Sequence, residues 1–185
     1  MKENVISVIK TALILLIIGF VCTLLLSLCN YITKDTIAEL TVKTENAAMA
    51  ETLPEAETFE KIEYEGDSTV VAVHEGKASG KTAGYCVKVE PVGYGGAISM
   101  IVGVSADGTV KGVKIVGMSE TPGLGAKAKD KSFTDAYIGK KSDIKVIKSG
   151  KAAENEIAAI SGATITSKAV TAGVNAAIVA TENLR

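Results

Sequence analysis

Six residues near the end of the chain, 161–166, carry the side chains best suited to chemistry. Their sequence is Ser-Gly-Ala-Thr-Ile-Thr, and they lead into a helical pattern over residues 167–183. Small residues and hydroxyls before a helix place N–H groups and oxygens where an anionic group can bind against the positive end of the helix dipole. The same residue types are common helix caps, with Thr166 or Ser167 as candidates. The stretch alone therefore predicts either an attachment point for an anion or an ordinary cap.

Two glycine-rich loops precede this stretch. Residues 93–96 read Gly-Tyr-Gly-Gly, which predicts a bulge, a bend or a close approach of the backbone to a ligand. Residues 120–125 read Glu-Thr-Pro-Gly-Leu-Gly, and Pro122-Gly123 marks a turn. The loop is either an ordinary structural turn, which would need only Pro122-Gly123, or a loop that lies against a flat ligand, which the second glycine and the mixture of polar and apolar side chains suit. The loop over residues 93–96 does not fit a phosphate-binding or dinucleotide-binding fingerprint.

Composition argues against several classes of protein and site. The net charge is −1, no basic run occurs and aromatic residues make up 4% of the chain, which argues against a nucleic-acid partner. His74 is the only histidine, which argues against a zinc site and against a Ser-His or Cys-His nucleophile pair. Cys22 and Cys29 are expected to be apolar packing residues, with a metal or cluster shared with another chain as the alternative. Cys86 has no possible disulfide partner outside the N-terminal apolar run.

The N-terminal part predicts a membrane anchor. Residues 11–29 contain no charged side chain, and this length predicts an uncleaved transmembrane helix. Lys2 and Lys10 precede the run, while Lys34 and Lys43 follow it at greater distance. This distribution favours a cytoplasmic N-terminus and an extracytoplasmic domain.

A domain with helices and a sheet is expected after the anchor. The helix should continue over residues 35–52 and end at Leu53-Pro54, and the acidic residues 51–65 should form a solvated connection. From Ser68 onward the apolar residues follow the two-residue period or the short runs typical of strands. Asp107-Gly108 predicts a tight hairpin with positive φ at both residues. The expected strands are residues 69–74, 84–89, 97–104 and 110–116.

The C-terminal part should supply further elements around this sheet. A helix over residues 132–138 with Ser132 as its cap and a strand over residues 143–147 are expected. Val170, Val174 and Ile178 recur every four residues, so one face of the last helix should pack on the sheet, with Gly173 allowing close approach. The predicted fold class is α+β, a mainly antiparallel sheet flanked by helices. Five lysines are expected to form a solvated face: Lys129, Lys131, Lys140, Lys141 and Lys145.

The motifs, in this order behind one apolar span, resemble the FMN-binding G subunit of the Rnf electron-transport complex. The C subunit of the sodium-pumping NADH:quinone reductase is a related family. The resemblance covers nearly the whole chain and implies that Thr164, which closes the Ser-Gly-Ala-Thr motif, is esterified to the phosphate of FMN. It also implies that the loop over residues 120–125 lies by the flavin. Many members have an Asp where Ala158 stands here. The implied cofactor-binding residues are Thr164, Ser161, Gly162, Ala163, Glu120, Thr121, Gly123 and Leu124.

The function that the resemblance implies is electron transfer by one covalent FMN, without catalytic residues or a metal of the chain's own. The implied partners are a flavin transferase that uses FAD and the other subunits of a membrane complex. That complex would couple electron transfer between reduced ferredoxin and NAD to movement of Na⁺ or H⁺. The alternatives are a stand-alone extracytoplasmic flavoprotein reductase, and a non-redox anchored assembly module in which Thr164 is only a cap.

The expected organisation has four segments. They are a cytoplasmic N-terminus (residues 1–10), a transmembrane helix (11–31), a juxtamembrane helix with a linker (32–60) and an FMN-binding domain (61–185).

Overall fold

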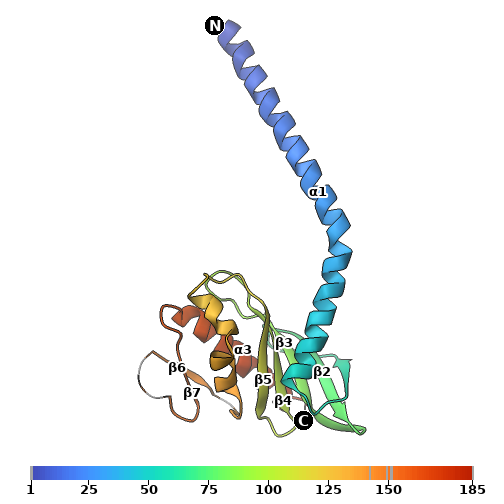
Figure 1. Cartoon of the computed structure of the whole chain (residues 1–185), viewed down its shortest axis with the longest axis vertical. Coiled ribbons are helices and arrows are strands. Elements are labelled where there is room, and N and C mark those ends of the chain that lie inside the picture. Colours follow the sequence, from blue (N-terminus) through green and yellow to red (C-terminus); the bar gives the residue numbers. More distant parts are fainter. Residues whose placement is uncertain (1, 142, 149, 151, 185) are drawn as a thin grey trace. The chain divides into compact units, whose positions relative to one another are not determined.

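The computed structural model describes residues 2–141, 143–148, 150 and 152–184, with side chains from residue 8 onward. The chain forms two compact units, Met1–Lys43 and Thr44–Arg185. Helix α1 (Lys2–Thr52) runs through both (Figure 1). It ends one residue before Leu53-Pro54, as the sequence predicts, because Pro disfavours helix in the preceding residue.

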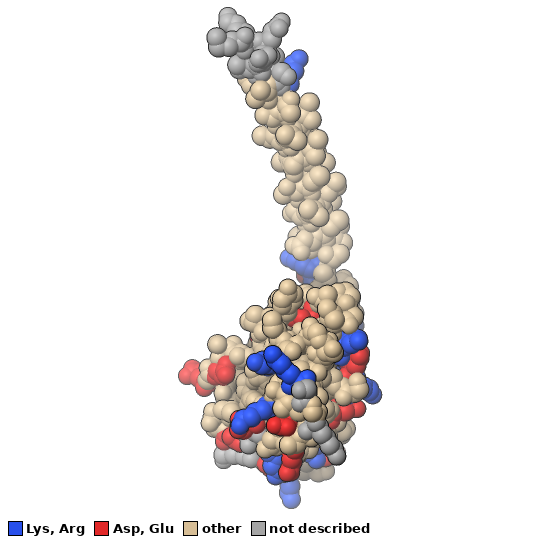
Figure 2. Space-filling model, turned by 90° about the vertical axis from the view of Figure 1, so that its left-hand side faces the viewer, with Lys and Arg blue, Asp and Glu red and all other residues tan. Residues whose placement is uncertain are grey.

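The first unit is the apolar part of α1. Its side chains from residue 8 to 43 are exposed, including Leu16 at 70% and Leu26 at 72%. The best window of the stretch Val8–Thr52 has a mean hydropathy of 2.9, and the helix is long and apolar enough to cross a membrane. Figure 2 shows that most of this helix carries neither acidic nor basic side chains. Lys34 Nζ lies 5.2 Å from the ring centroid of Tyr31, an arrangement typical of residues at a membrane interface.

A five-stranded antiparallel sheet forms the centre of the second unit. Its strands follow one another in space as in sequence (Figure 1), so each strand pairs with the next one along the chain. The four expected strands are confirmed, with shifted ends. The strands are β1 (Thr58–Ile62), β2 (Val70–Ala78), β3 (Lys81–Val89), β4 (Ser99–Ser105) and β5 (Val110–Gly117).

The two faces of the sheet carry separate cores. Cys86 packs with Met49 and Leu53 at the end of α1, whereas its neighbour Val87 packs with helix α3 (Thr164–Glu182). Successive side chains of a strand point to opposite faces, so the sheet lies between the last turns of α1 and α3. Burial raises the pKa of the Cys86 thiol to about 12, which marks it as a packing residue.

The hairpin between β4 and β5 is confirmed, but the expected turn geometry is wrong. Gly108 has a φ of 87°, whereas Asp107 has no positive φ. The Asp107 carboxylate accepts hydrogen bonds from the hydroxyls of Ser105 and Thr109 and from the backbone N–H of Thr109. An Asp side chain that satisfies the turn in this way does not need the left-handed conformation.

Three expectations for local structure are corrected. Residues 58–62, expected in a solvated acidic connection, form β1, because β2 offers them a pairing edge. The helix expected over residues 132–138 is a short α2 (Lys131–Thr134) followed by a 3₁₀ turn, η2 (Asp135–Tyr137), and Asp130 rather than Ser132 stands at its N-cap. A 3₁₀ turn, η1 (Gly125–Lys129), precedes them. The expected strand over residues 143–147 is β6 (Lys145–Ile147), and it pairs in parallel with β7 (Glu156–Ala158), which was not predicted.

Helix α3 packs as its sequence pattern predicts. Val170, Val174 and Ile178 are at most 1% exposed and belong to the larger core. A Cβ at Gly173 would lie 2.9 Å from Pro91 Cγ and would overlap the end of Met100. Glycine therefore lets the helix approach the β3–β4 connection closely.

Candidate functional site

The two glycine-rich loops and the start of α3 meet at one cavity of about 500 Å³. The loop after β3 contributes Tyr94, the loop after β5 contributes Glu120, and the segment before α3 contributes Thr164. Segments far apart in the chain are thus brought to one end of the sheet. The full lining is Tyr94, Glu120, Thr121, Leu124, Gly125, Gly162, Ala163, Thr164, Ile165 and Thr166.

Most of the site residues expected from the sequence lie at this cavity. Ser161 and Gly123 do not line it, and both are exposed. The expected set omits the lining residues Tyr94, Gly125 and Ile165, although the loop motifs contained the first two. Thr166 also lines the cavity, and the sequence suggested only a cap for it.

The carboxylate of Glu120 joins all three segments. One oxygen, Oε1, accepts hydrogen bonds from the backbone N–H groups of Tyr94 at 2.8 Å and Gly95 at 3.1 Å. The other, Oε2, accepts a hydrogen bond of 2.8 Å from the Thr166 hydroxyl. Glu120 is only 8% exposed, and a buried carboxylate needs such partners. The loop after β5 is therefore bonded to the loop after β3 and to the first turn of α3.

Glycines leave the space that this carboxylate occupies. A Cβ at Gly93 would overlap Glu120 Oε1 and lie 2.8 Å from Ile98 Cδ1. A Cβ at Gly125 would lie 2.6 Å from Glu120 Oε2 and 2.7 Å from Thr166 Oγ1. The glycines at positions 93 and 125 thus allow a close approach to a protein carboxylate, an alternative that the sequence did not suggest.

The predicted cap of the last helix is wrong. Helix α3 begins at Thr164, and Ala163 stands at its N-cap without a side-chain hydrogen bond. The Thr166 hydroxyl is bonded to Glu120 instead. The Ser167 hydroxyl accepts from Ile160 N at 3.0 Å and donates to Ala163 O at 2.9 Å. Both candidate caps therefore lie inside the helix, and the N–H groups of its first turn have no side-chain cap.

Thr164 differs from the other hydroxyls of the stretch. It lines the cavity, is partly buried and opens α3. Thr166 and Ser167 are at most 1% exposed and are hydrogen-bonded, and Ser161 lies away from the cavity. Among the described residues, no hydrogen bond to the Thr164 hydroxyl is found. Among the hydroxyls of this stretch, that of Thr164 is thus the one that a group bound in the cavity can reach.

Comparison with known proteins places these features in a family. Residues 93–179, which contain all three motifs, match the FMN-binding domain family, and residues 1–51 match the RnfG N-terminal region. The chain is 42% identical to the G subunit of the Na(+)-translocating ferredoxin:NAD(+) oxidoreductase complex of Acetobacterium woodii, over 96% of this chain and 93% of that protein. This chain belongs to the family of G subunits.

Other relatives agree with this assignment. The chain is 38% identical to the G subunit of the proton-translocating ferredoxin:NAD(+) oxidoreductase complex of Clostridium ljungdahlii, over 86% of this chain and 83% of that one. The resemblance to the Rnf family is thereby confirmed. Within the described part of the chain, the apolar helix is the single membrane-spanning segment.

Solved structures of C subunits of the related reductase share the fold. NqrC of Shewanella oneidensis has a TM-score of 0.53 and 23% identity, over 66% of this chain and 65% of that chain. The C subunit of the Na(+)-translocating NADH-quinone reductase of Parabacteroides distasonis has a TM-score of 0.58 and 19% identity, over 75% and 90%. The expected α+β fold with an antiparallel sheet is confirmed.

The rim of the cavity in this G subunit is apolar and exposed. Tyr94 is 72% exposed, Ile165 is 56% exposed and Leu124 is 44% exposed. Large apolar side chains gathered around a cavity mark a surface that a ligand or partner covers. The cavity thus combines the polar lining residues Glu120 and Thr164 with exposed apolar side chains, which suits a ligand that has an anionic end and a flat apolar end.

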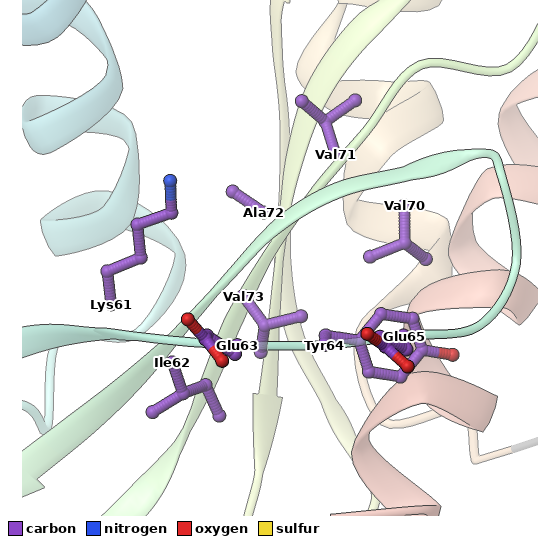
Figure 3. Close-up of a pocket in the computed structure, with 9 residues that line it drawn as sticks. All are labelled: Lys61, Ile62, Glu63, Tyr64, Glu65, Val70, Val71, Ala72 and Val73. Carbon is purple, nitrogen blue, oxygen red and sulfur yellow. The ribbon is translucent and has the colours of Figure 1, made fainter.

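A second cavity of the protein, of about 600 Å³, lies where β1 and β2 separate. Figure 3 shows that the backbone of residues 61–65 diverges from β2 on one side of this space. Tyr64 and Val70 pack against the larger core there, and Glu63 and Glu65 are exposed. None of the three motifs contributes to this lining, so the smaller cavity is the candidate site.

Proposed function

We propose that one FMN is attached to this G subunit by a phosphoester bond at Thr164, and that the flavin passes electrons within a membrane-bound ferredoxin:NAD oxidoreductase complex that translocates ions. The family assignment supports the complex, because relatives are named as subunits of ion-translocating ferredoxin:NAD(+) oxidoreductases. The match of residues 93–179 to the FMN-binding domain family supports the cofactor.

The choice of Thr164 as the attachment point rests on the burial and hydrogen bonding of the hydroxyl groups in this stretch. Thr166 and Ser167 are buried and hydrogen-bonded. Thr164 lines the cavity and opens the 19-residue helix α3, whose N-cap lacks a side-chain hydrogen bond. The uncapped N–H groups and the positive end of the helix dipole stabilise a phosphate at this point.

The residues present fit FMN. The first turn of α3 suits the phosphate, and the apolar rim of Tyr94, Leu124 and Ile165 suits a flat ring. Bound FMN supplies the redox chemistry, and the protein supplies position and solvent exclusion. We assign to Thr121 and Gly123 a place beside the ring, and to Ser161, Gly162 and Ala163 the shape of the chain before Thr164. Gly162 has a φ of 77°, a conformation that glycine adopts without strain.

Attachment requires a second protein. A threonine hydroxyl is a weak nucleophile without a base, and the Glu120 carboxylate at the cavity is hydrogen-bonded to the hydroxyl of Thr166 and not to that of Thr164. We therefore assign the base to a flavin transferase that uses FAD. Thr164 Oγ1 forms a bond to the phosphorus of the FMN half, the pyrophosphate bond breaks and AMP leaves. The hydroxyl proton passes to the transferase.

The ion pathway belongs to other subunits in this proposal. Residues 11–29 carry no charged side chain, whereas ion pathways through membranes are lined by charged or polar groups. Lys2 and Lys10 before the span support a cytoplasmic N-terminus with the FMN domain on the other side of the membrane.

Covalent flavin attachment tests the proposal directly. The full-length protein is co-expressed with a flavin transferase and separated by denaturing electrophoresis. We expect a fluorescent band from the wild type and from Ser132→Ala, which removes an exposed hydroxyl that does not line the cavity. Thr164→Val should abolish the band, because valine keeps the shape and lacks the oxygen.

Peptide mass mapping and co-purification complete the test. We expect the added mass of FMN minus water on the peptide that contains Thr164, and several membrane proteins in the native preparation. A colourless wild-type protein, or a fluorescent Thr164→Val protein, would contradict the attachment. Isolation of the flavoprotein alone from native membranes would contradict the assembly.

A further inference from the structure

We propose that Glu120 is a positioning residue for flavin attachment: its carboxylate holds the first turn of α3 so that the Thr164 hydroxyl faces the cavity, and it does not act on Thr164 itself. This inference rests on the proposed function and concerns how the acceptor hydroxyl is presented to the transferase. The resemblance of the sequence implied only that Glu120 lies by the flavin.

The contact between Glu120 and Thr166 fixes the start of α3. Oε2 of Glu120 accepts the Thr166 hydroxyl hydrogen at 2.8 Å, and the two residues are 46 positions apart. Thr164 and Thr166 belong to the same helical turn, so a constraint on the Thr166 side chain sets the direction in which Thr164 points. The Thr166 hydroxyl also donates its hydrogen to the carboxylate. It is therefore not available to receive the FMN phosphate in place of Thr164.

The other oxygen of Glu120 holds a second segment of the cavity lining, the loop after β3. Oε1 accepts the N–H groups of Tyr94 and Gly95, so the loop that carries the exposed Tyr94 ring is bonded to the residue that holds α3. Hydrogen bonds to an ionised carboxylate are stronger than those between neutral groups. One side chain therefore sets the spacing of this loop and α3.

The surrounding glycines are needed because of this carboxylate and not because of their backbone conformation. Gly93 and Gly125 have no positive φ, yet a Cβ at either position would lie against Glu120. Gly125 is the sharper case, because its Cβ would lie 2.6 Å from Glu120 Oε2 and 2.7 Å from Thr166 Oγ1. Alanine at this position would separate the bonded pair.

A matched set of substitutions tests the proposal by the initial rate of FMN transfer from FAD to the full-length protein in detergent with a purified flavin transferase. Glu120→Ala should lower the rate at least tenfold, on the order of the loss expected when a reacting group is misplaced. Glu120→Gln should stay within about fivefold of the wild-type rate, because an amide can accept from the two N–H groups and donate to the Thr166 oxygen.

Two further pairs of variants locate the effect. Thr166→Val should lower the rate, and Thr166→Ser should restore it. Gly125→Ala should lower it, whereas Gly117→Ala should not, because a Cβ at Gly117 would lie at an ordinary 3.6 Å from Ser99 Cβ. In every modified variant the flavin should map to Thr164.

Hydrogen exchange of the unmodified protein gives a readout that does not depend on the transferase. Glu120→Ala should speed exchange of the Tyr94 and Gly95 amides and of residues 161–166 by about tenfold or more, whereas exchange in β3 and β4 should be unchanged. A variant that failed to fold would instead lose protection throughout the sheet, and Glu120→Gln would then carry the test.

Several outcomes would overturn the proposal. A Glu120→Ala protein with the wild-type rate and wild-type exchange would show that Glu120 has no such role. A Glu120→Gln rate as low as that of Glu120→Ala, with wild-type exchange, would show that the carboxylate acts directly on Thr164. Failure of the proposed function looks different, since the wild-type protein would then take up no flavin while the exchange result still decides whether Glu120 holds α3.

Discussion

The ammonium group of Lys88 lies 2.7 Å from a carboxylate oxygen of Glu45, and this ion pair joins β3 to the last turns of α1. The side chains are only 18% and 22% exposed. The pair between Lys114 and Glu51, also on α1, has exposed fractions of 43% and 48%, so the Lys88 pair is better shielded from water. We therefore expect the Lys88–Glu45 pair to contribute more to the stability of the domain than the Lys114–Glu51 pair.

Glu45→Gln should lower the free energy of unfolding of the domain by about 1–2 kcal/mol, because the half-buried Lys88 ammonium loses its nearest charged partner. Urea denaturation of the detergent-solubilised protein, followed by circular dichroism, measures the change. Glu51→Gln is the matched control and should change the value by less than about 0.5 kcal/mol. Equal losses in the two variants would contradict the role assigned to shielding.

The Lys88 pair also predicts a dependence on pH. Burial alone lowers the pKa of Lys88, but the hydrogen bond from Lys88 to Glu45 and the charges of Glu45 and Glu90 outweigh burial and raise it above 10.5. A pKa raised by folding contributes stability that is complete below the unfolded value and is lost as the pH rises through the folded value. The difference between wild type and Glu45→Gln should therefore be constant near neutral pH and shrink above about pH 10.5.

Gly112→Ala and Gly103→Ala should each destabilise the domain by about 1–3 kcal/mol through overpacking. A Cβ at Gly112 would lie 2.9 Å from Thr52 Cα, and one at Gly103 would overlap the Thr52 carbonyl oxygen. These are backbone atoms of α1 and cannot rotate away. The same urea titration measures the loss, with Gly117→Ala as the control. A Gly112→Ala protein as stable as Gly117→Ala would contradict the close packing of α1 on the sheet.

The proposed orientation predicts which side of the membrane a label reaches. Ser132 is exposed on α2, so a Ser132→Cys protein that also carries Cys22→Ala and Cys29→Ala should react in intact cells with a maleimide that cannot cross membranes. Cys86 is 0% exposed, and its pKa of about 12 keeps the thiol protonated, so it adds no background. Labelling only after the cells are permeabilised would show that the domain lies on the cytoplasmic side and would contradict the proposed orientation.

Local patterns predicted much of this fold. The end of α1 before Leu53-Pro54 follows from the geometry of proline, and the face of α3 formed by Val170, Val174 and Ile178 follows from the helical period. In contrast, β1 contains only two apolar residues, Phe59 and Ile62, within an acidic stretch, and its pairing with β2 decides its structure. A strand at a sheet edge has little local signal because its hydrogen-bond partner lies on another strand.

The sequence by itself determined the apolar span, the main strands, the last helix and the family to which the motifs belong. The tertiary structure decided what the motif residues do. From the sequence, Thr166 was expected to cap a helix and Glu120 to lie in a loop beside the ligand. In the structure they form a hydrogen bond with each other, although they are 46 positions apart. Such a choice of partner depends on how β5 and α3 meet, because a buried carboxylate takes whichever donors the packed elements bring within reach. The same packing leaves Thr164 at the cavity.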